Sequence, residues 1–188
     1  MIGVSLVGLG LADWALLAFH LDRRALLGDA MIPVVYAGAM AADGVAALFV
    51  GHAFDRARRS GRSGLRVLAA TLVLAAASLP LVLVGGTAAA LVGVALWAMG
   101  LGATESIGKA TVAILSPPSR RGGAYGIYYA VFGGSWWVGS IAIGALSDWS
   151  RAAAGAFGAS ALLLAALVML AADRAASAHG ASRVGTTV

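Results

Sequence analysis

The stretch LRVLAATLVLAAASLPLVLV, residues 65–84, has one charged side chain, Arg66, among twenty consecutive residues. The hydrocarbon core of a bilayer is about 30 Å thick, and roughly 20 mostly apolar residues cross it as an α-helix. The stretch lacks the alternation of polar and apolar residues that is typical of an outer-membrane strand. Because a helix satisfies its own backbone in lipid, the stretch predicts a transmembrane helix.

Five further stretches have the same character, which gives six predicted spans: residues 2–19, 30–54, 65–84, 87–115, 123–147 and 152–172. Hydrophobic residues make up 61% of the 188 residues and charged residues only 11%, against about 25% charged in soluble domains. A soluble fold could not cover so much apolar surface. We therefore expect an all-α polytopic membrane protein whose partner is the lipid bilayer, with a six-helix membrane domain over residues 1–172 and a flexible cytoplasmic tail over residues 173–188.

Arginine is distributed unevenly between the predicted loops. With six spans, nine arginines fall on the side of the two termini: Arg56, Arg58, Arg59, Arg62, Arg66, Arg120, Arg121, Arg174 and Arg183. Three fall on the other side: Arg23, Arg24 and Arg151. The positive-inside rule then predicts a cell (plasma or inner) membrane protein with both termini in the cytoplasm. Because the basic residues flank membrane spans, the charge of +5 does not indicate a nucleic-acid partner.

Four ionisable residues lie well inside the predicted spans: Asp13, Asp43, Glu105 and Lys109. A charge near the bilayer centre costs about 2.5–3.5 kcal/mol on insertion scales, so such residues face a protein interior or a water-filled cavity. Glu105 and Lys109 are four residues apart, with the acid first, which favours an ion pair on one helix. Either this pair neutralises itself within the bundle, or it lines a permeation path and binds a solute or a coupling proton.

The two aspartates invite different interpretations. Asp13 lies midway along the first span without a local partner, which favours a proton site; a hydrogen bond to a neighbouring helix is the alternative. Asp43, in the sequence MAADG, is interpreted as a packing residue that bonds a neighbouring helix.

The fifth span is rich in glycine and aromatic residues. The spacings Gly122/Gly126, Ser135/Gly139 and Ser140/Gly144 are small-xxx-small pairs, which predict close helix packing. Tyrosine and tryptophan side chains stand between them, and these would face lipid or interface, or line a cavity for an amphipathic solute.

No residue set indicates catalysis. The chain has no cysteine and three histidines, none of which forms a cluster with metal-ligand spacing. No nucleophile and base are expected together at membrane depth. We therefore expect no enzyme activity, no metal and no cofactor.

Two motifs resemble the major facilitator superfamily of transporters. The sequence GHAFDRARR, with Gly51, Asp55, Arg56 and Arg59, resembles the family's cytoplasmic loop motif and falls between the second and third spans. The sequence GLGATES, followed by Lys109, Arg121-Gly122 and Gly126, then by Gly139-Ser140 and GALSD from Gly144, resembles the carboxyl-terminal half of a bacterial subgroup. The likeness covers about residues 10–150.

The resemblance implies a six-helix half whose first and fourth spans line a central cavity, where Asp13, Glu105 and Lys109 would bind substrate or the coupling proton. It implies a gating role for Gly51, Asp55, Arg56 and Arg59. Such transporters hold substrate between two six-helix halves, so the expected partner is a second half or a second copy of this chain. The expected function is alternating-access transport of a small solute, coupled to protons; the alternative is a non-transporting membrane scaffold or a truncated transporter remnant.

Overall fold

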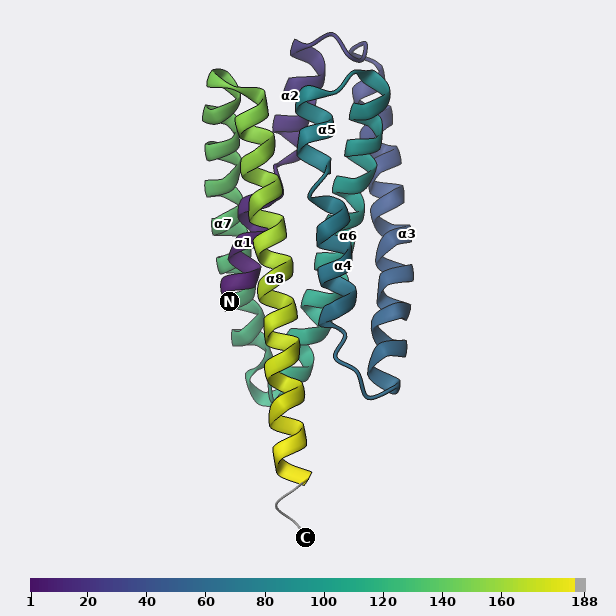
Figure 1. The fold of residues 1–188 in the computed structure, drawn as a ribbon. Coiled ribbons are helices and arrows are strands. Elements are labelled where there is room, and N and C mark those ends of the chain that lie inside the picture. Colours follow the sequence, from purple (N-terminus) through teal and green to yellow (C-terminus); the bar gives the residue numbers. More distant parts are fainter. Residues whose placement is uncertain (185–188) are drawn as a thin grey trace.

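The computed structural model describes the backbone of residues 1–184 and the side chains of residues 1–175. All regular structure in this part of the chain is helical (Figure 1). The elements are α1 (Ile2–Gly10), α2 (Trp14–Arg23), α3 (Met31–Arg59), α4 (Leu65–Ala75), α5 (Ser78–Val84), α6 (Thr87–Leu115), the 3₁₀ turn η1 (Pro118–Arg120), α7 (Arg121–Trp149) and α8 (Arg151–Val184).

These elements form six spans that are long and apolar enough to cross a membrane, which confirms the six predicted spans. They cover Ile2–Arg23, Met31–Arg59, Leu65–Val84, Thr87–Leu115, Pro118–Trp149 and Arg151–Ala175. Most helices extend about a turn past the predicted bounds, because charged side chains at a helix end can reach water while the backbone stays helical.

Two spans are interrupted, which the hydropathy pattern does not reveal. The third span breaks between α4 and α5 at Ala76 and Ala77. Pro80 lies in the first turn of α5, where a residue without a backbone N–H is tolerated because no intrahelical bond is lost. The first span breaks between Gly10 and Trp14, so the single helix predicted over residues 2–19 is wrong in this detail.

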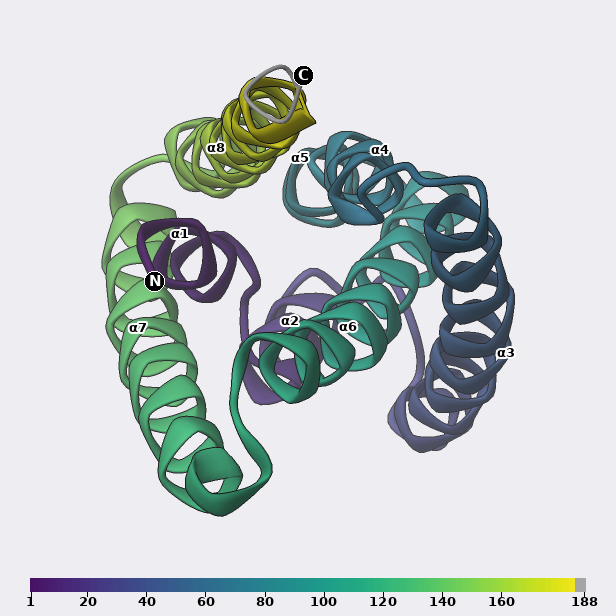
Figure 2. The same ribbon diagram turned by 90° about the horizontal axis from the view of Figure 1, so that it is seen from below.

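The contacts that spans one to three make with spans four to six follow a repeated pattern. α1, in the first span, packs against α7 and α8, the fifth and sixth spans. Correspondingly, α6, the fourth span, packs against α3, the second, and against α4 and α5, the third. The third span, which consists of α4 and α5, packs against the sixth, α8. If span one is exchanged with span four, two with five and three with six, the same set of contacts is obtained. Viewed along the bundle, α8, α4 and α5 form one side, while α7 and α3 diverge on the other with α2 and α6 between them (Figure 2).

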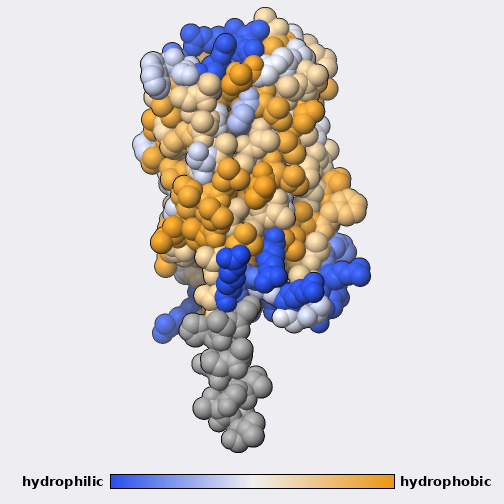
Figure 3. Space-filling view, viewed as in Figure 1, coloured by the Kyte–Doolittle hydropathy of each residue, from blue (hydrophilic) through white to orange (hydrophobic). Residues whose placement is uncertain are grey.

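An apolar belt separates two charged ends (Figure 3). Arg24 donates hydrogen bonds to the carbonyls of Leu83 and Gly85 at the end of α5, with Nη1–O distances of 3.2 and 2.6 Å. A cation beside the last carbonyls of a helix is favoured by the helix dipole. His20 Nε2 also bonds the Leu83 carbonyl, at 3.1 Å, so the end of α2 is fixed to the end of α5.

Helical structure continues past the boundary placed at residue 172. α8 runs to Val184, and Asp173 is 1% exposed and forms an ion pair with Arg66 of α4. The packed unit therefore includes Asp173, one residue beyond the predicted membrane domain. Residues 185–188 of the predicted flexible tail lie outside the described residues.

The close approach predicted for the glycine-rich fifth span occurs at its middle. A Cβ on Gly139 would lie 2.7 Å from the Cα of Leu9, and a Cβ on Gly8 would meet Ser135. Gly144 is looser, with Leu16 Cδ1 at 3.7 Å. A Cβ added to Gly122 or Gly126, in the first turns of α7, would meet no atom of the described residues within 4 Å. The packing role expected of these two is therefore not present within the described part of the chain.

We expect Gly139→Ala to destabilise the chain, because the methyl group would collide with the α1 backbone, which cannot move aside as a flexible side chain can. Overpacking of this kind costs about 1–3 kcal/mol. Thermal unfolding in detergent measures the loss. Gly126→Ala is the matched control on the same helix, and an equal loss in both variants would contradict this packing.

Candidate functional site

The break in the first span lies about midway along that span, between Gly10 and Trp14 of Ile2–Arg23, and its free backbone groups bond to two other helices. Leu11 and Ala12 are fully buried. The indole Nε1 of Trp97 in α6 donates to the carbonyl of Ala12 at 2.9 Å. The backbone N–H of Asp13 donates to Oγ of Ser140 in α7 at 3.1 Å. Unpaired backbone groups are costly in a bilayer, so these side chains allow the helix to be unwound here.

Asp13 is the N-cap of α2. Its backbone is extended, and Oδ1 accepts a hydrogen bond from the N–H of Ala15 at 3.3 Å. The expectation that Asp13 lacks a local partner is therefore wrong: aspartate is a favoured N-cap because its oxygen satisfies a free N–H of the first turn. None of the three ion pairs found among the described residues includes Asp13.

A pocket of about 240 Å³ opens beside this break. It is lined by Asp13 and by residues on one face of α7: Gly133, Trp136, Trp137 and Ser140. Trp137 is 69% exposed, whereas Trp136 is half-buried and packs on Phe132 with 5.4 Å between ring centroids. The aromatic residues of the fifth span therefore serve both packing and pocket lining.

Glu105 and Lys109 form the ion pair that their spacing predicts. Lys109 Nζ lies 2.9 Å from Glu105 Oε2, and both side chains are about half exposed. Tyr125 of α7 donates its hydroxyl to the carbonyl of Lys109 at 3.0 Å. The pair is thus not hidden within the six-helix unit but lies on its surface, next to α7.

Asp43 of α3 approaches α6 at Gly102, which lies one turn before Glu105. A Cβ on Gly102 would overlap the carbonyl of Asp43 and come within 2.8 Å of its Oδ1. Oδ1 is buried, and no hydrogen bond reaches it from the part of the chain that the structure describes. Asp43 therefore marks a close approach of α3 and α6, without the interhelical hydrogen bond that was expected.

The two polar groups occupy corresponding places in the two halves of the fold. Asp13 lies where the first span meets α7, the fifth; Glu105 and Asp43 lie where the fourth span meets α3, the second. The exchange of spans one to three with spans four to six maps one location onto the other. The structure thus keeps Asp13 and the Glu105–Lys109 pair apart, on two helices of the divergent side.

The predicted gating residues lie on the last turns of α3 rather than in a loop, because α3 continues to Arg59 and the connection is confined to residues 60–64. Gly51 approaches Ser106 of α6, with 3.1 Å between an added Cβ and Oγ. Asp55 and Arg59 line a groove against the end of α6. Asp55, Arg56 and Arg59 belong to none of the ion pairs found among the described residues.

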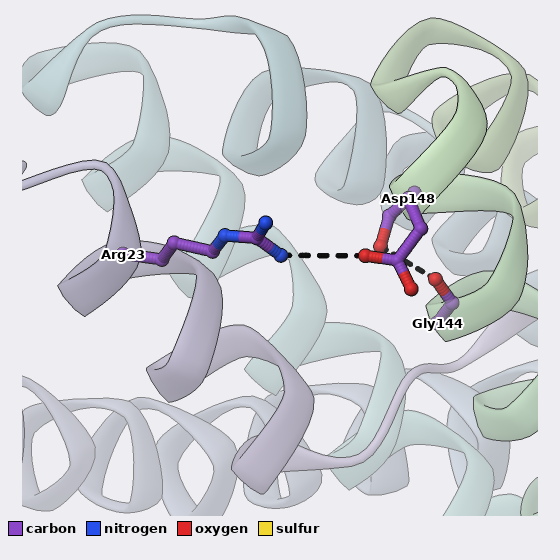
Figure 4. A network of polar contacts seen from close by, with 4 residues as sticks. Arg23, Gly144 and Asp148 are labelled. Atoms are coloured by element: carbon purple, nitrogen blue, oxygen red, sulfur yellow. Dashed lines mark hydrogen bonds and ion pairs between the residues drawn. The ribbon is translucent and has the colours of Figure 1, made fainter.

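The structure adds two ion pairs that sequence reasoning missed: Arg66–Asp173, described above, and Arg23–Asp148. Arg23 at the end of α2 and Asp148 near the end of α7 are joined by a hydrogen bond of 3.3 Å between Nη1 and Oδ1, beside Gly144 (Figure 4). The two residues are 125 positions apart, and only knowledge that the first and fifth spans are neighbours could have paired them. Both side chains are well exposed, so the pair contributes at most about 1 kcal/mol.

No group of three histidine, cysteine or carboxylate side chains is arranged to hold a metal within the described residues.

The chain is similar to proteins of Mycobacterium bovis and of two strains of Mycobacterium tuberculosis, each described only as uncharacterized. Each is 36% identical over 140 residues, which is 74% of this chain. The matched part is 33% of each relative, so the chain spans about a third of the length of the curated relatives it matches. No family model matches the chain, and no solved structure matches it.

We expect Trp97→Phe to destabilise the chain by about 1–3 kcal/mol, because the buried carbonyl of Ala12 would lose its donor while ring packing is largely kept. Thermal unfolding in detergent again provides the measurement. Trp149→Phe is the matched control, since Trp149 is 82% exposed. If the two variants unfold alike, the indole bond does not hold the break.

Proposed function

We propose that this chain is one half of a secondary transporter that moves a small solute by alternating access, coupled to protons. The observation that carries the proposal is that polar groups inside the spans lie on the first and fourth spans, which correspond to each other in the repeated contact pattern. An interrupted first span with Asp13, and a fourth span with Glu105 and Lys109, lie at corresponding places of a three-plus-three arrangement. Inverted repeats with broken helices at the midplane are typical of secondary transporters.

The motifs quoted from the sequence support the major facilitator superfamily as the type of transporter. In that reading Asp13, Glu105 and Lys109 contact the solute or the proton. Gly51, Asp55, Arg56 and Arg59 bias the two access states from the charged end of α3. The divergent side between α3 and α7 is then the wall of the solute path.

A second six-helix unit is the expected partner on this side. In an 18-residue apolar window of the spans that contain α3 and α7, only 11% and 17% of the residues are buried, against 56% in the third and fourth spans. Their exposed residues include polar and small groups beside the large apolar ones, a mixture that suits a protein interface better than uniform lipid contact. The unit is either a separate polypeptide, part of a longer chain, or a second copy of this chain.

Neutralising the mid-depth acids tests the proposal. We expect Asp13→Asn and Glu105→Gln each to lower solute transport at least tenfold, because the removed charge binds the solute or the proton. Vesicles containing the full chain and an internal pH dye are exposed to organic cations, organic anions and neutral sugars, and the solute-driven pH change is recorded.

Asp148→Asn is the control for this experiment, because Asp148 is a solvent-exposed acid in the last turn of α7, whereas Asp13 and Glu105 lie well inside their spans. Transport by both acid variants at the control rate would remove these residues from the site. No transport by the unaltered chain, alone or with a partner, would favour the scaffold or remnant.

We further propose that both termini face the cytoplasm of a cell membrane. The chain contains no cysteine, so single cysteines can be introduced without background. We expect a membrane-impermeant maleimide added to intact cells to label Ser150→Cys and to spare Arg62→Cys until the cells are opened. The reverse labelling pattern would invert the orientation.

A further inference from the structure

The pocket beside the broken first span carries a single formal charge. Asp13 contributes a carboxylate, and the other lining residues are Gly133, Trp136, Trp137 and Ser140. Each of the three ion pairs found among the described residues lies elsewhere, and none involves Asp13. The Asp13 side chain is exposed and accepts a hydrogen bond from the N–H of Ala15, but no cation of the described residues pairs with it, so a cation that enters the pocket can bind this carboxylate.

The walls of the pocket determine which kind of cation fits. Tryptophan is the side chain that attracts a cation most strongly over its face, and aromatic groups are how proteins recognise quaternary ammonium ligands. Hard metal cations such as Ca²⁺ instead take six to eight oxygen ligands. The pocket lining offers one carboxylate and one hydroxyl, which is too few. A neutral or anionic solute would leave the carboxylate unpaired.

We infer that the pocket formed by Asp13, Trp136, Trp137 and Ser140 binds a small organic cation of the ammonium type. The carboxylate pairs with the cationic head and the indole of Trp137 covers it. The volume of about 240 Å³ lies just below the range of drug-sized pockets, about 300–1,000 Å³, and so suits a small ligand. That this cation is the transported solute rests on the function proposed above; its binding does not.

Binding can be measured without a transport assay. The full chain in lipid nanodiscs is titrated calorimetrically with benzyltrimethylammonium, and separately with phenylmethanesulfonate, an anion of similar size with the same ring. We expect saturable binding of the cation and none of the anion. Empty nanodiscs correct for partition into lipid.

Variants then locate the site. Asp13→Asn should weaken cation binding at least tenfold while leaving α2 intact, because asparagine caps helices about as well as aspartate. Trp137→Ala should weaken it about two- to thirtyfold, as expected from the loss of one cation–π contact, and the exposed position of Trp137 makes misfolding of this variant a minor concern. Trp137→Phe should keep part of the affinity.

Asp148→Asn serves as the matched control, since it removes an exposed aspartate of α7 outside the pocket and should leave affinity unchanged. Equal affinity for cation and anion, or unchanged cation affinity in both Asp13→Asn and Trp137→Ala, would overturn the assignment. Cation binding by a chain that fails to transport would sustain the site and count only against the transporter proposal.

Discussion

The requirement that every backbone polar group in hydrocarbon have a partner governs this molecule. It makes all six spans helical, and it explains why the unwound segment of the first span is surrounded by donors and acceptors. The carbonyl of Ala12 is bonded by Trp97, the N–H of Asp13 by Ser140, and the N–H of Ala15 by the Asp13 side chain. Without these three bonds, a break at this depth would be too costly to persist.

The hydropathy of the sequence predicts the number of spans and their approximate positions. The six spans could be predicted because each is a run of apolar residues of membrane length, a property of the local sequence. The breaks could not, because Leu11 and Ala12 are as apolar as their neighbours. What stabilises the first break is a tryptophan 85 residues away and a serine 127 residues from Asp13. Only the helix arrangement brings them there.

The candidate site shows the same division. Glu105 and Lys109 are paired by helical periodicity, so their 2.9 Å contact could be predicted from a spacing of four. Asp43 was predicted to bond a neighbouring helix, whereas its contact with Gly102 and its buried oxygen without a hydrogen bond depend on how α3 crosses α6. The glycines of α7 look equivalent in sequence, yet a Cβ on Gly139 would collide with α1, whereas a Cβ on Gly126 would meet no atom of the described residues within 4 Å. The small-residue spacing gives the capacity for close packing, and the neighbouring helix decides which residues use it.

The anchoring of the first span also determines how it can deform. The last carbonyl before Asp13 is bonded to α6 and the next N–H to α7, and α6 and α7 make little contact with each other along their lengths. If α6 and α7 separated, the hydrogen bonds from Trp97 and Ser140 would displace adjacent backbone groups of the unwound segment in different directions. The segment between Gly10 and Trp14 would absorb the displacement as dihedral rotation. α1 and α2 would then change their tilt relative to each other, with the segment between Gly10 and Trp14 as the hinge.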